Sequence, residues 1–570
     1  MCGKSTPSLP MATRIRTICL IHCSLAGAFA GLGLTVTSLD PPAGTASLPS
    51  LLADLPEPPD CVIHQEHLGK RFILTDIDAA PCPTIFWACD PHLNFFWQRH
   101  YACQFTATAS TQPQLTQAFA ASGAAHTAWI TWHGHKRPFI PFARRRNTLA
   151  FVGRLTPNRR RRQWFADHLA AYGLVPSQAA YGEAMAAVYD DARLAPNECI
   201  AGEVNQRLFE AAGSGCLPLS ERTPEGVAEL FVPDREALYY DDVLELDGQL
   251  AFAAAHPGVI EKMAQAAHAA VGQRHLAEHR AAALLALAGQ AANAPGSPAT
   301  GPDAAAATAL TLFALFRSDQ MALPQAAVWE RLAGAPITPA VAAAMLRLAG
   351  QTGQRPALAH LAGLCLGRPE LAGDVQTAAA ACLACCRLND LEGARRAYAA
   401  YVGAAGKTRA ARLDTHYDYL VFFAAALEGK GHGGAPGMVF DPDQHVPENA
   451  VECLQAAKLL RPDALEADRR LAAVLRRRPG TQAERVGLLS TLSLYRRNDW
   501  SLGLELGLTN LHAFRREPGI EEAIIAAEAA AAQGQLDRFS RRLAQADPAG
   551  RLRAALLQHG IHVPDPGIIP

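Results

Sequence analysis

Apolar and polar positions follow two different rhythms in the first half of the chain. Short apolar or β-branched runs indicate strands, and apolar residues that recur every three or four positions indicate amphipathic helices. Strands are expected at 15–22, 34–39, 61–64, 84–89, 104–107, 127–131, 148–153, 192–195 and 216–220, with helices through Leu32 and at 114–121, 160–172 and 203–212. Strands that alternate with helices predict parallel pairing with crossover helices, here in two tandem α/β sheets.

The second half has a helical rhythm almost throughout. Residues 289–303 contain mainly Gly, Ala, Pro, Ser and Asn, which predicts a linker. Helices are then expected at 323–333, 339–348, 372–388, 391–402, 409–427, 448–460, 464–477, 484–495, 502–515 and 521–532, with an exposed loop at 429–447. The predicted domains are 1–145, 146–288 and a helical region at 304–550, followed by a tail at 551–570.

Composition excludes several classes of protein. The 570 residues are 49% hydrophobic and carry a formal net charge of −1, so a single small module, wholesale disorder and an overall attraction to nucleic acid are all excluded. The 14 cysteines are scattered, which indicates reduced thiols in the cytoplasm. Cys382, Cys385 and Cys386 are expected to be buried thiols on an Ala-rich helix, because no second ligand pair follows at zinc-site spacing.

The N-terminus allows two interpretations. Arg14 and Arg16 precede an apolar run at 18–36, which could be a signal peptide or the opening strand, helix and strand of a nucleotide-binding unit. Polar residues and glycines interrupt the run, so the second interpretation is favoured and no membrane anchor is expected. Met11 is an alternative start.

The segment 203–220 carries the most informative chemistry. Arg207 and Glu210 lie three residues apart on one helix face, and Gly213-Ser214-Gly215 then leads into an apolar strand. A carboxylate there can accept both hydroxyls of a ribose, and glycine-flanked N–H groups can reach a diphosphate. The alternative is a surface ion pair of Arg207 with Glu210 and a simple helix cap.

The six residues Asn205-Gln206-Arg207-Leu208-Phe209-Glu210 resemble the nucleotide-binding helix of CgeB-like glycosyltransferases, spore-maturation relatives within the GT-B class. The resemblance extends over about residues 15–287. It is also carried by Phe151-Val152-Gly153-Arg154-Leu155 with Arg159 to Arg162, by Ala228-Glu229-Leu230-Phe231 with Tyr239 and Tyr240, and by His275 with Arg280.

This resemblance implies two tandem Rossmann-like domains of the GT-B type that bind a nucleotide-diphosphate sugar. Glu210 would bind the ribose, and Arg154 with Arg159 or Arg160 would bind the diphosphate. The remaining donor-binding residues would be Asn205, Arg207, Gly213, Ser214 and Gly215. The four-arginine run could equally be a solvated helix start. The residue eight before Glu210 is Gly202, so the paired glutamates of the wider class are not matched and Glu203 is not taken as catalytic.

Asp90 and His92 are the candidate catalytic residues. They follow an apolar strand, so they should lie at its carboxyl end, where they could orient or deprotonate an acceptor hydroxyl. The alternative is a helix cap by Asp90 beside a surface His92. No metal site is expected, because His133-Gly134-His135 lacks a nearby third ligand, and no cofactor is expected besides the donor substrate.

The helical region locally resembles tetratricopeptide units at 389–398, 453–463 and 533–539, although the full consensus is met nowhere. The fold class expected for the whole chain is therefore α/β plus all-α: two Rossmann-like domains followed by TPR-like repeats.

The leading hypothesis is a glycosyltransferase that acts on a polysaccharide or protein, with the repeats engaging this acceptor or a partner. An alternative is a catalytically silent scaffold that binds proteins through its repeats. A dinucleotide oxidoreductase comes third, because Ala26 to Gly31 only superficially resembles the G-x-G-x-x-G fingerprint.

Overall fold

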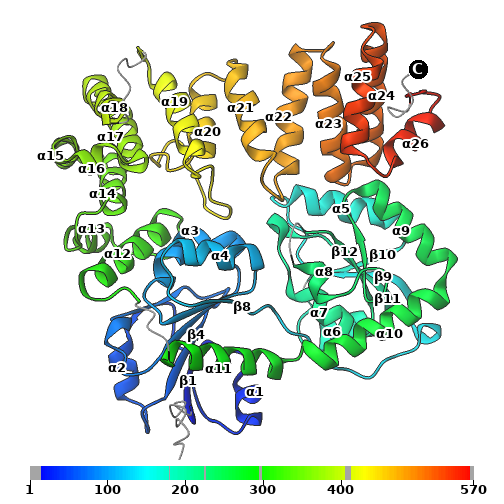
Figure 1. Cartoon of the computed structure of the whole chain (residues 1–570), viewed down its shortest axis with the longest axis horizontal. Coiled ribbons are helices and arrows are strands. Elements are labelled where there is room, and N and C mark those ends of the chain that lie inside the picture. The colour runs from blue at the N-terminus through cyan, green and yellow to red at the C-terminus, as the bar shows by residue number, and fades with distance from the viewer. Residues whose placement is uncertain (1–14, 179, 224–225, 294–297, 405–411, 565–570) are drawn as a thin grey trace, which may run out of the picture. The chain divides into compact units, whose positions relative to one another are not determined.

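A computed structural model describes residues 15–564 apart from 179, 224–225, 294–297 and 405–411 (Figure 1). Met11 and residues 294–297 of the expected linker lie outside the described residues. The chain divides into two compact units. Unit 1 comprises 1–132, 277–345 and 436–439, and unit 2 comprises 133–276, 346–435 and 440–570. This grouping differs from the expected domain boundaries, because 277–345 groups with the first sheet.

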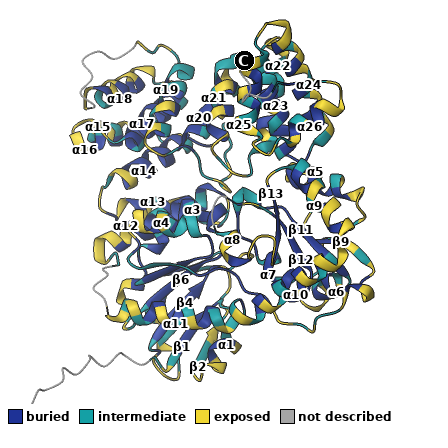
Figure 2. Ribbon diagram, turned by 45° about the vertical axis from the view of Figure 1, so that its right-hand side comes forward, coloured by how far each residue is buried: buried dark blue, intermediate teal, exposed yellow. Residues whose placement is uncertain are grey.

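Unit 1 contains a parallel sheet with the strand order β2-β1-β4-β6-β7-β8. Its strands are β1 (Thr17–Ile21), β2 (Thr35–Leu39), β4 (Cys61–Gln65), β6 (Thr84–Ala88), β7 (Ala107–Ser110) and β8 (Thr127–Trp129), beside a separate parallel pair of β3 (Gly44–Ser47) and β5 (Phe72–Thr75). All residues of β4, β6 and β7 are buried, as expected for the middle of a sheet that helices cover (Figure 2).

Unit 1 also contains helices, and several of them cover the first sheet. They include α1 (Ala26–Gly31), α2 (Leu48–Ala53), α3 (Pro91–Ala102), α4 (Pro113–Ala121), α11 (Ala277–Asn293), α12 (Gly301–Arg317) and α13 (Gln325–Ala333), and α14 (Pro339–Gln351) runs from unit 1 into unit 2. Helix α11 packs on β6, β7 and α1, and α12 packs on α3. The apolar run at 18–36 therefore forms β1, α1 and β2, as the nucleotide-binding interpretation predicted.

Unit 2 contains a second parallel sheet, with the strand order β10-β9-β11-β12-β13. Its strands are β9 (Asn147–Val152), β10 (Leu174–Ser177), β11 (Ala192–Asn197), β12 (Leu217–Glu221) and β13 (Leu238–Tyr240). The helices around it are α5 (Arg160–Ala170), α6 (Glu183–Asp190), α7 (Gln206–Gly213), α8 (Val227–Leu230), α9 (Val243–Ala255) and α10 (Pro257–Arg274).

Helices make up most of the rest of unit 2. They are α15 (Arg355–Leu366), α16 (Pro369–Ala372), α17 (Val375–Arg387), α18 (Leu391–Ala404), α19 (His416–Gly429), α20 (Ala450–Leu460), α21 (Leu465–Leu475), α22 (Gln482–Tyr495), α23 (Trp500–His512), α24 (Arg516–Ala532), α25 (Leu536–Ala546) and α26 (Arg551–Gln558). Helices α19 to α24 each pack on the next one along the chain.

The last helices share one hydrophobic core with the second sheet. Phe514 lies 4.9 Å from Phe165 and 6.0 Å from Tyr240 between ring centroids, and Leu552 and Leu556 of α26 are buried in the same cluster. The expected tail at 551–570 is therefore wrong for its first half. A helix forms there because its apolar face has the second α/β domain to pack against.

The expected fold class is confirmed: two parallel α/β sheets are followed by a large helical region. The tetratricopeptide character of the helices stays a prediction.

Some of the predicted element boundaries were wrong. The strand expected at 104–107 is β7 at Ala107–Ser110, because Gln104 and Phe105 still bond back to the end of α3. Strands β3, β5, β10 and β13 were not predicted.

The segment 429–447 contains neither helix nor strand beyond the end of α19, but it is not wholly exposed. Val446 is fully buried, and its side chain lies beside Gly350 of α14.

Cys382, Cys385 and Cys386 are buried in α17, as predicted. Among the described residues, no helix combines the length and the apolarity that crossing a membrane requires.

Candidate functional site

The topology of the second sheet indicates where a ligand binds. In the order β10-β9-β11-β12-β13, the central neighbours are β9 and β11. From β9 the chain adds its next strand, β10, on one side, and from β11 it adds β12 and β13 on the other side, so the switch point lies between β9 and β11. In open parallel sheets, ligands bind outside the carboxyl ends of the strands at this switch point. Those ends are Val152 of β9 and Asn197 of β11.

Arg207 occupies this switch point. It lies in the first turn of α7, where its Nε donates to the Val152 carbonyl at 2.6 Å and its Nη1 donates to Asn197 Oδ1 at 2.7 Å. The guanidinium carbon lies 4.5 Å from the ring centroid of Phe151. A Cβ at position 153 would stand only 3.0 Å from Nη2, so Gly153 leaves the space that this cation fills. Arg207 is thus a fixed positive charge that joins the ends of both central strands.

Two asparagines complete this edge. Asn205 Nδ2 donates to Asn197 Oδ1 at 2.9 Å, while the Tyr240 hydroxyl donates to the Asn197 carbonyl at 2.8 Å. The Oδ1 atom of Asn205 is buried and has no hydrogen-bond partner in the described part of the chain. A buried acceptor of this kind is rare in folded proteins and is available to a ligand.

Glu210 follows Arg207 by three residues on α7. The pKa of its carboxyl is raised to about 7, because burial removes water from the charged form and the nearby charge of Arg207 offsets this only in part. Its carboxylate forms no hydrogen bond or ion pair with any residue in the ranges that the structure describes. The alternative of a surface pair with Arg207 is wrong, because the guanidinium binds Val152 and Asn197 instead.

The four-arginine run divides into two halves. Arg154 and Arg159 are exposed in the loop that connects β9 to α5, and Arg160, the first residue of α5, is exposed as well, all at the same sheet edge as Arg207. Arg154 Nη2 donates to the Tyr181 hydroxyl at 3.4 Å. Arg161 and Arg162 are buried. Only the first half can meet a diphosphate.

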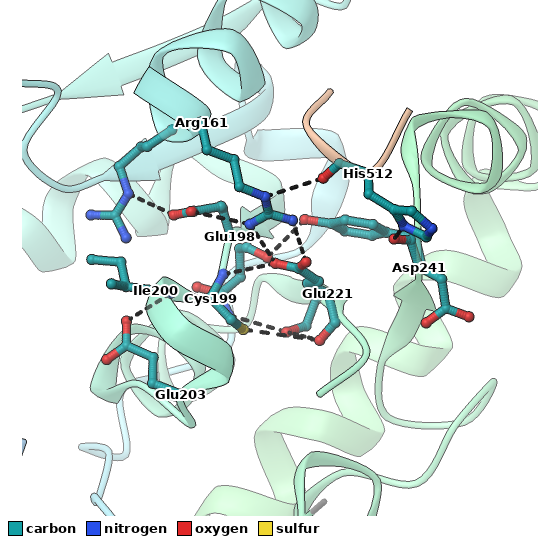
Figure 3. A network of polar contacts seen from close by, with 12 residues as sticks. Arg161, Glu198, Cys199, Ile200, Glu203, Glu221, Asp241 and His512 are labelled. Carbon is teal, nitrogen blue, oxygen red and sulfur yellow. Dashed lines mark hydrogen bonds and ion pairs between the residues drawn. The ribbon is translucent and has the colours of Figure 1, made fainter. Parts of the chain in front are cut away.

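The buried half forms an ion-pair network with the ends of β11 and β12 (Figure 3). Arg161 Nη1 lies 3.2 Å from Glu198 Oε1 and 3.0 Å from Glu221 Oε2, and Arg162 Nε lies 2.7 Å from Glu198 Oε2. Arg161 Nε also donates to the carbonyl of His512, at the end of α23, at 3.1 Å. Glu198 directly follows Asn197, so this network joins the carboxyl edge of the sheet to the helical region.

The structure removes Gly213, Ser214 and Gly215 from the donor site. They form the carboxyl end of α7 and precede β12, so they lie at the amino edge of a parallel sheet, opposite to Arg207. A Cβ at position 213 would stand 2.3 Å from the carbonyl oxygen of His135, and one at position 215 would stand 2.7 Å from Nη2 of Arg145. These small residues let two chain segments pack closely, which is a different task from cradling phosphate.

Asp90 and His92 lie where the sequence predicted, directly after the buried strand β6. Their loop is held by the buried carboxylate of Glu66, which accepts the N–H groups of Cys89 at 2.9 Å and Asp90 at 2.8 Å. Asp90 is the residue before α3, but its side chain does not cap that helix, and His92 is 6% exposed. The alternative of a surface histidine is therefore wrong.

Three residues that organise these sites were missed from the sequence. Asn197 lies two residues beyond the expected end of its strand. Glu66 is a lone acid directly after an apolar strand, which was the available signal. Arg145 donates to the carbonyls of Tyr189 and Ser214 at 2.9 and 2.8 Å, contacts that depend wholly on the tertiary fold.

The second sheet and its switch-point residues form an open parallel α/β domain with a polar edge of the kind at which ligands bind. Residues 136–286 match a protein family described as glycosyl transferase-like. The match includes Arg154, Arg207 and Glu210. No curated protein matches the chain significantly.

The chain is also similar to several solved structures. One is sucrose-phosphate synthase from Thermosynechococcus elongatus, with 12% identity over 48% of this chain and 98% of that chain at a TM-score of 0.35. A second is a glycosyltransferase from Rickettsia africae ESF-5, with 8% identity over 49% and 99% at a TM-score of 0.35. A third is the Anabaena protein HepE in complex with UDP-glucose, with 14% identity over 47% and 99% at a TM-score of 0.33.

Proposed function

We propose that the protein is a glycosyltransferase that transfers a sugar from a nucleotide-diphosphate donor to a polysaccharide or protein acceptor. The observation that carries this proposal is the geometry of α7 within the family match. A fixed cation at the switch point and an unpaired carboxylate lie three residues apart on one helix.

The donor residues have distinct tasks in this proposal. Glu210 accepts hydrogen bonds from the ribose hydroxyls, since an anionic acceptor without a protein partner binds a hydroxyl strongly. Arg154 and one of Arg159 or Arg160 bind the diphosphate, because an exposed planar guanidinium can bond two phosphate oxygens at once. Arg207 and Asn205 hold the edge of the site and offer the remaining polar contacts.

Asp90 and His92 are the proposed acceptor-side residues. The buried Glu66 fixes the backbone of their loop, which supports a positioned rather than a freely moving pair. A neutral imidazole there can take the proton of an acceptor hydroxyl as the new glycosidic bond forms. We propose that no metal is needed, because guanidinium groups can neutralise the leaving diphosphate.

The test is release of nucleoside diphosphate from a panel of nucleotide sugars, with and without EDTA. For the donor that is used, Glu210→Ala and Glu210→Gln should lower kcat/KM about tenfold to hundredfold, mainly through KM, because the charged acceptor is lost. The matched control is Asp167→Asn, which neutralises an exposed acid on α5 and should leave both constants unchanged.

Unchanged turnover in both Glu210 variants would remove the donor role of this residue. Release that stops in EDTA would contradict the metal-free mechanism. If no donor is used but residues 303–550 still retain a protein partner, the chain is a catalytically silent scaffold. That result would contradict both the glycosyltransferase activity and the role of the helical region in engaging an acceptor.

A further inference from the structure

A cavity of about 690 Å³ opens in the last helices of unit 2, and its lining contains none of the residues at the carboxyl edge of the second sheet. It is formed by the first turn of α23, the connection between α24 and α25, and one face of α25. We call it the arginine pocket, after Arg538, Arg541 and Arg542, which line it. All of its lining residues belong to unit 2.

One face of α25 is built for charge. Arg538, Arg541, Arg542 and Gln545 recur at helical spacing, so they share a face, while Phe539 and Leu543 on the opposite face are buried in the core. Arg538 and Arg541 are exposed, and neither forms a hydrogen bond or ion pair with any described residue. These two guanidinium groups are therefore available to a ligand.

The third arginine is held in place. Arg542 Nη1 donates to the Ser501 hydroxyl, and its Nη2 lies 3.8 Å from Glu505 Oε2. Glu505 is shared with Arg485, which approaches its Oε1 at 2.7 Å. Asp499, the acid that lines the pocket, accepts the backbone N–H of Leu502 as a helix cap, and its Oδ2 lies 4.0 Å from Arg496 Nη1. The acids are thus engaged, and positive charge is left in excess.

Amide groups and one aromatic ring complete the lining. The Trp500 indole N–H donates to Gln535 Oε1 at 3.0 Å, which leaves the Gln535 amide nitrogen available. Gln545 has no hydrogen-bond partner among the described residues. Amides donate and accept hydrogen bonds equally well, which suits the hydroxyl groups of a sugar.

We propose that the arginine pocket binds an anionic glycan through a carboxylate or phosphate group. Charge complementarity selects the anion, because guanidinium forks form paired, charge-assisted hydrogen bonds with these groups. The amides and the single aromatic ring select a polyhydroxylated chain over a peptide helix or a lipid, which would need a broader apolar surface. Binding of the glycan is independent of the proposed function. Only the use of this glycan as an acceptor rests on the proposed function.

The test is isothermal calorimetry on the full chain at low salt, with no nucleotide sugar present. The probes are a hexamer of galacturonic acid and its neutral counterpart, maltohexaose. The galacturonate hexamer should bind, more weakly as salt is added, and maltohexaose should not. Hexaglutamate and phosphatidylglycerol vesicles are tested in parallel as the competing anionic partners.

The double variant Arg538→Gln, Arg541→Gln should weaken hexamer binding at least about tenfold, because it removes two charge-assisted contacts. Its thermal midpoint should equal that of the wild type, since neither side chain has a partner to lose. The matched control, Arg476→Gln with Arg477→Gln, neutralises two exposed arginines at the end of α21 and should bind as the wild type does. Gln545→Glu, which adds a negative charge to the pocket, should weaken binding as well.

The proposal is overturned if the galacturonate hexamer does not bind, if maltohexaose binds equally, or if the double variant binds like the wild type. Tighter binding of hexaglutamate or of the vesicles overturns the glycan assignment. In the transfer assay, the double variant should raise KM for an anionic acceptor and leave KM for the donor unchanged. Failure here is thus separable from failure at Glu210.

Discussion

Glu210 has lost much of its hydration without gaining a hydrogen bond or ion pair from any described residue. A buried carboxylate in this state is available to a ligand. Its raised pKa also brings its titration into the neutral range, where an ordinary glutamate is fully ionised.

The affinity for the donor's nucleoside diphosphate should therefore depend on pH. Because the folded-state pKa is raised to about 7, Glu210 is mostly protonated at pH 6 and mostly charged at pH 8, and the charged form is the stronger acceptor. We expect Kd to fall about threefold to tenfold from pH 6 to pH 8 in the wild type. Calorimetry at several pH values measures this change.

The comparison with Glu210→Gln isolates the side chain. Titration of the ligand's phosphate is common to both proteins, so the ratio of their Kd values reports Glu210 alone. A ratio that stays constant between pH 6 and pH 8 would show that Glu210 does not titrate in the site.

Gly213 to Gly215 show how far local chemistry can mislead. A glycine-rich turn after a helix suits both a phosphate and a close chain crossing, and the two tasks use the same residues. Only the direction of the strands, which places this turn at the amino edge of the sheet, shows that the turn serves a close chain crossing and not a phosphate.

At the scale of elements, the four arginines at 159–162, where α5 begins, divide into an exposed pair and a buried pair. The helical period turns consecutive residues to different sides, so Arg160 remains exposed while Arg161 and Arg162 are buried against the carboxyl ends of β11 and β12. The sequence showed the run and its place at a helix start. It did not show which members pair with Glu198 and Glu221, because those acids come from strands elsewhere in the chain.

Arg161→Met should destabilise the protein strongly. Its removal leaves Glu221, and one oxygen of Glu198, without their buried counter-charge, which costs about 3–5 kcal/mol in comparable networks. Arg160→Met, one residue away and exposed, should change stability by less than about 0.5 kcal/mol. Urea unfolding followed by tryptophan fluorescence measures both variants, and equal midpoints would contradict a stabilising network.

Helix α7 and strand β7 were each predicted with a shifted boundary. The pattern began α7 at Glu203, but the helix begins at Gln206, which leaves Asn205 extended before the first turn and able to reach Asn197. Hydrophobic period identifies the type of an element, whereas its ends depend on caps and tertiary contacts. Here the end of the element is part of the site.

At the scale of the whole molecule, the final helices are part of the second α/β domain's core. Phe514, Leu552 and Leu556 are buried in the same cluster as Phe165 and Tyr240 of the sheet and its helices. The chain segment expected to be a tail thus helps to hold the second α/β domain together.

Two neighbouring leucines in α26 test this arrangement. Leu556 is fully buried and Leu557 is 60% exposed. Leu556→Ala should lower the free energy of unfolding by about 2–4 kcal/mol through lost burial and a cavity, and Leu557→Ala by less than about 0.5 kcal/mol. Urea denaturation of the two variants gives the comparison, and a small effect of Leu556→Ala would show that α26 does not belong to this core.

Apart from strands β3, β5, β10 and β13, the sequence by itself determined the strands of the two α/β sheets, the helical region and the helix that carries Arg207 and Glu210. These follow from periodicity and spacing, which act over a few residues and are legible along one chain. The tertiary structure alone decided that Arg207 joins Val152 to Asn197, that the Gly213 turn lies at the far edge of the sheet, and that the last helix completes a core. Those outcomes depend on groups brought together from distant parts of the chain, and no local pattern encodes which of them will meet.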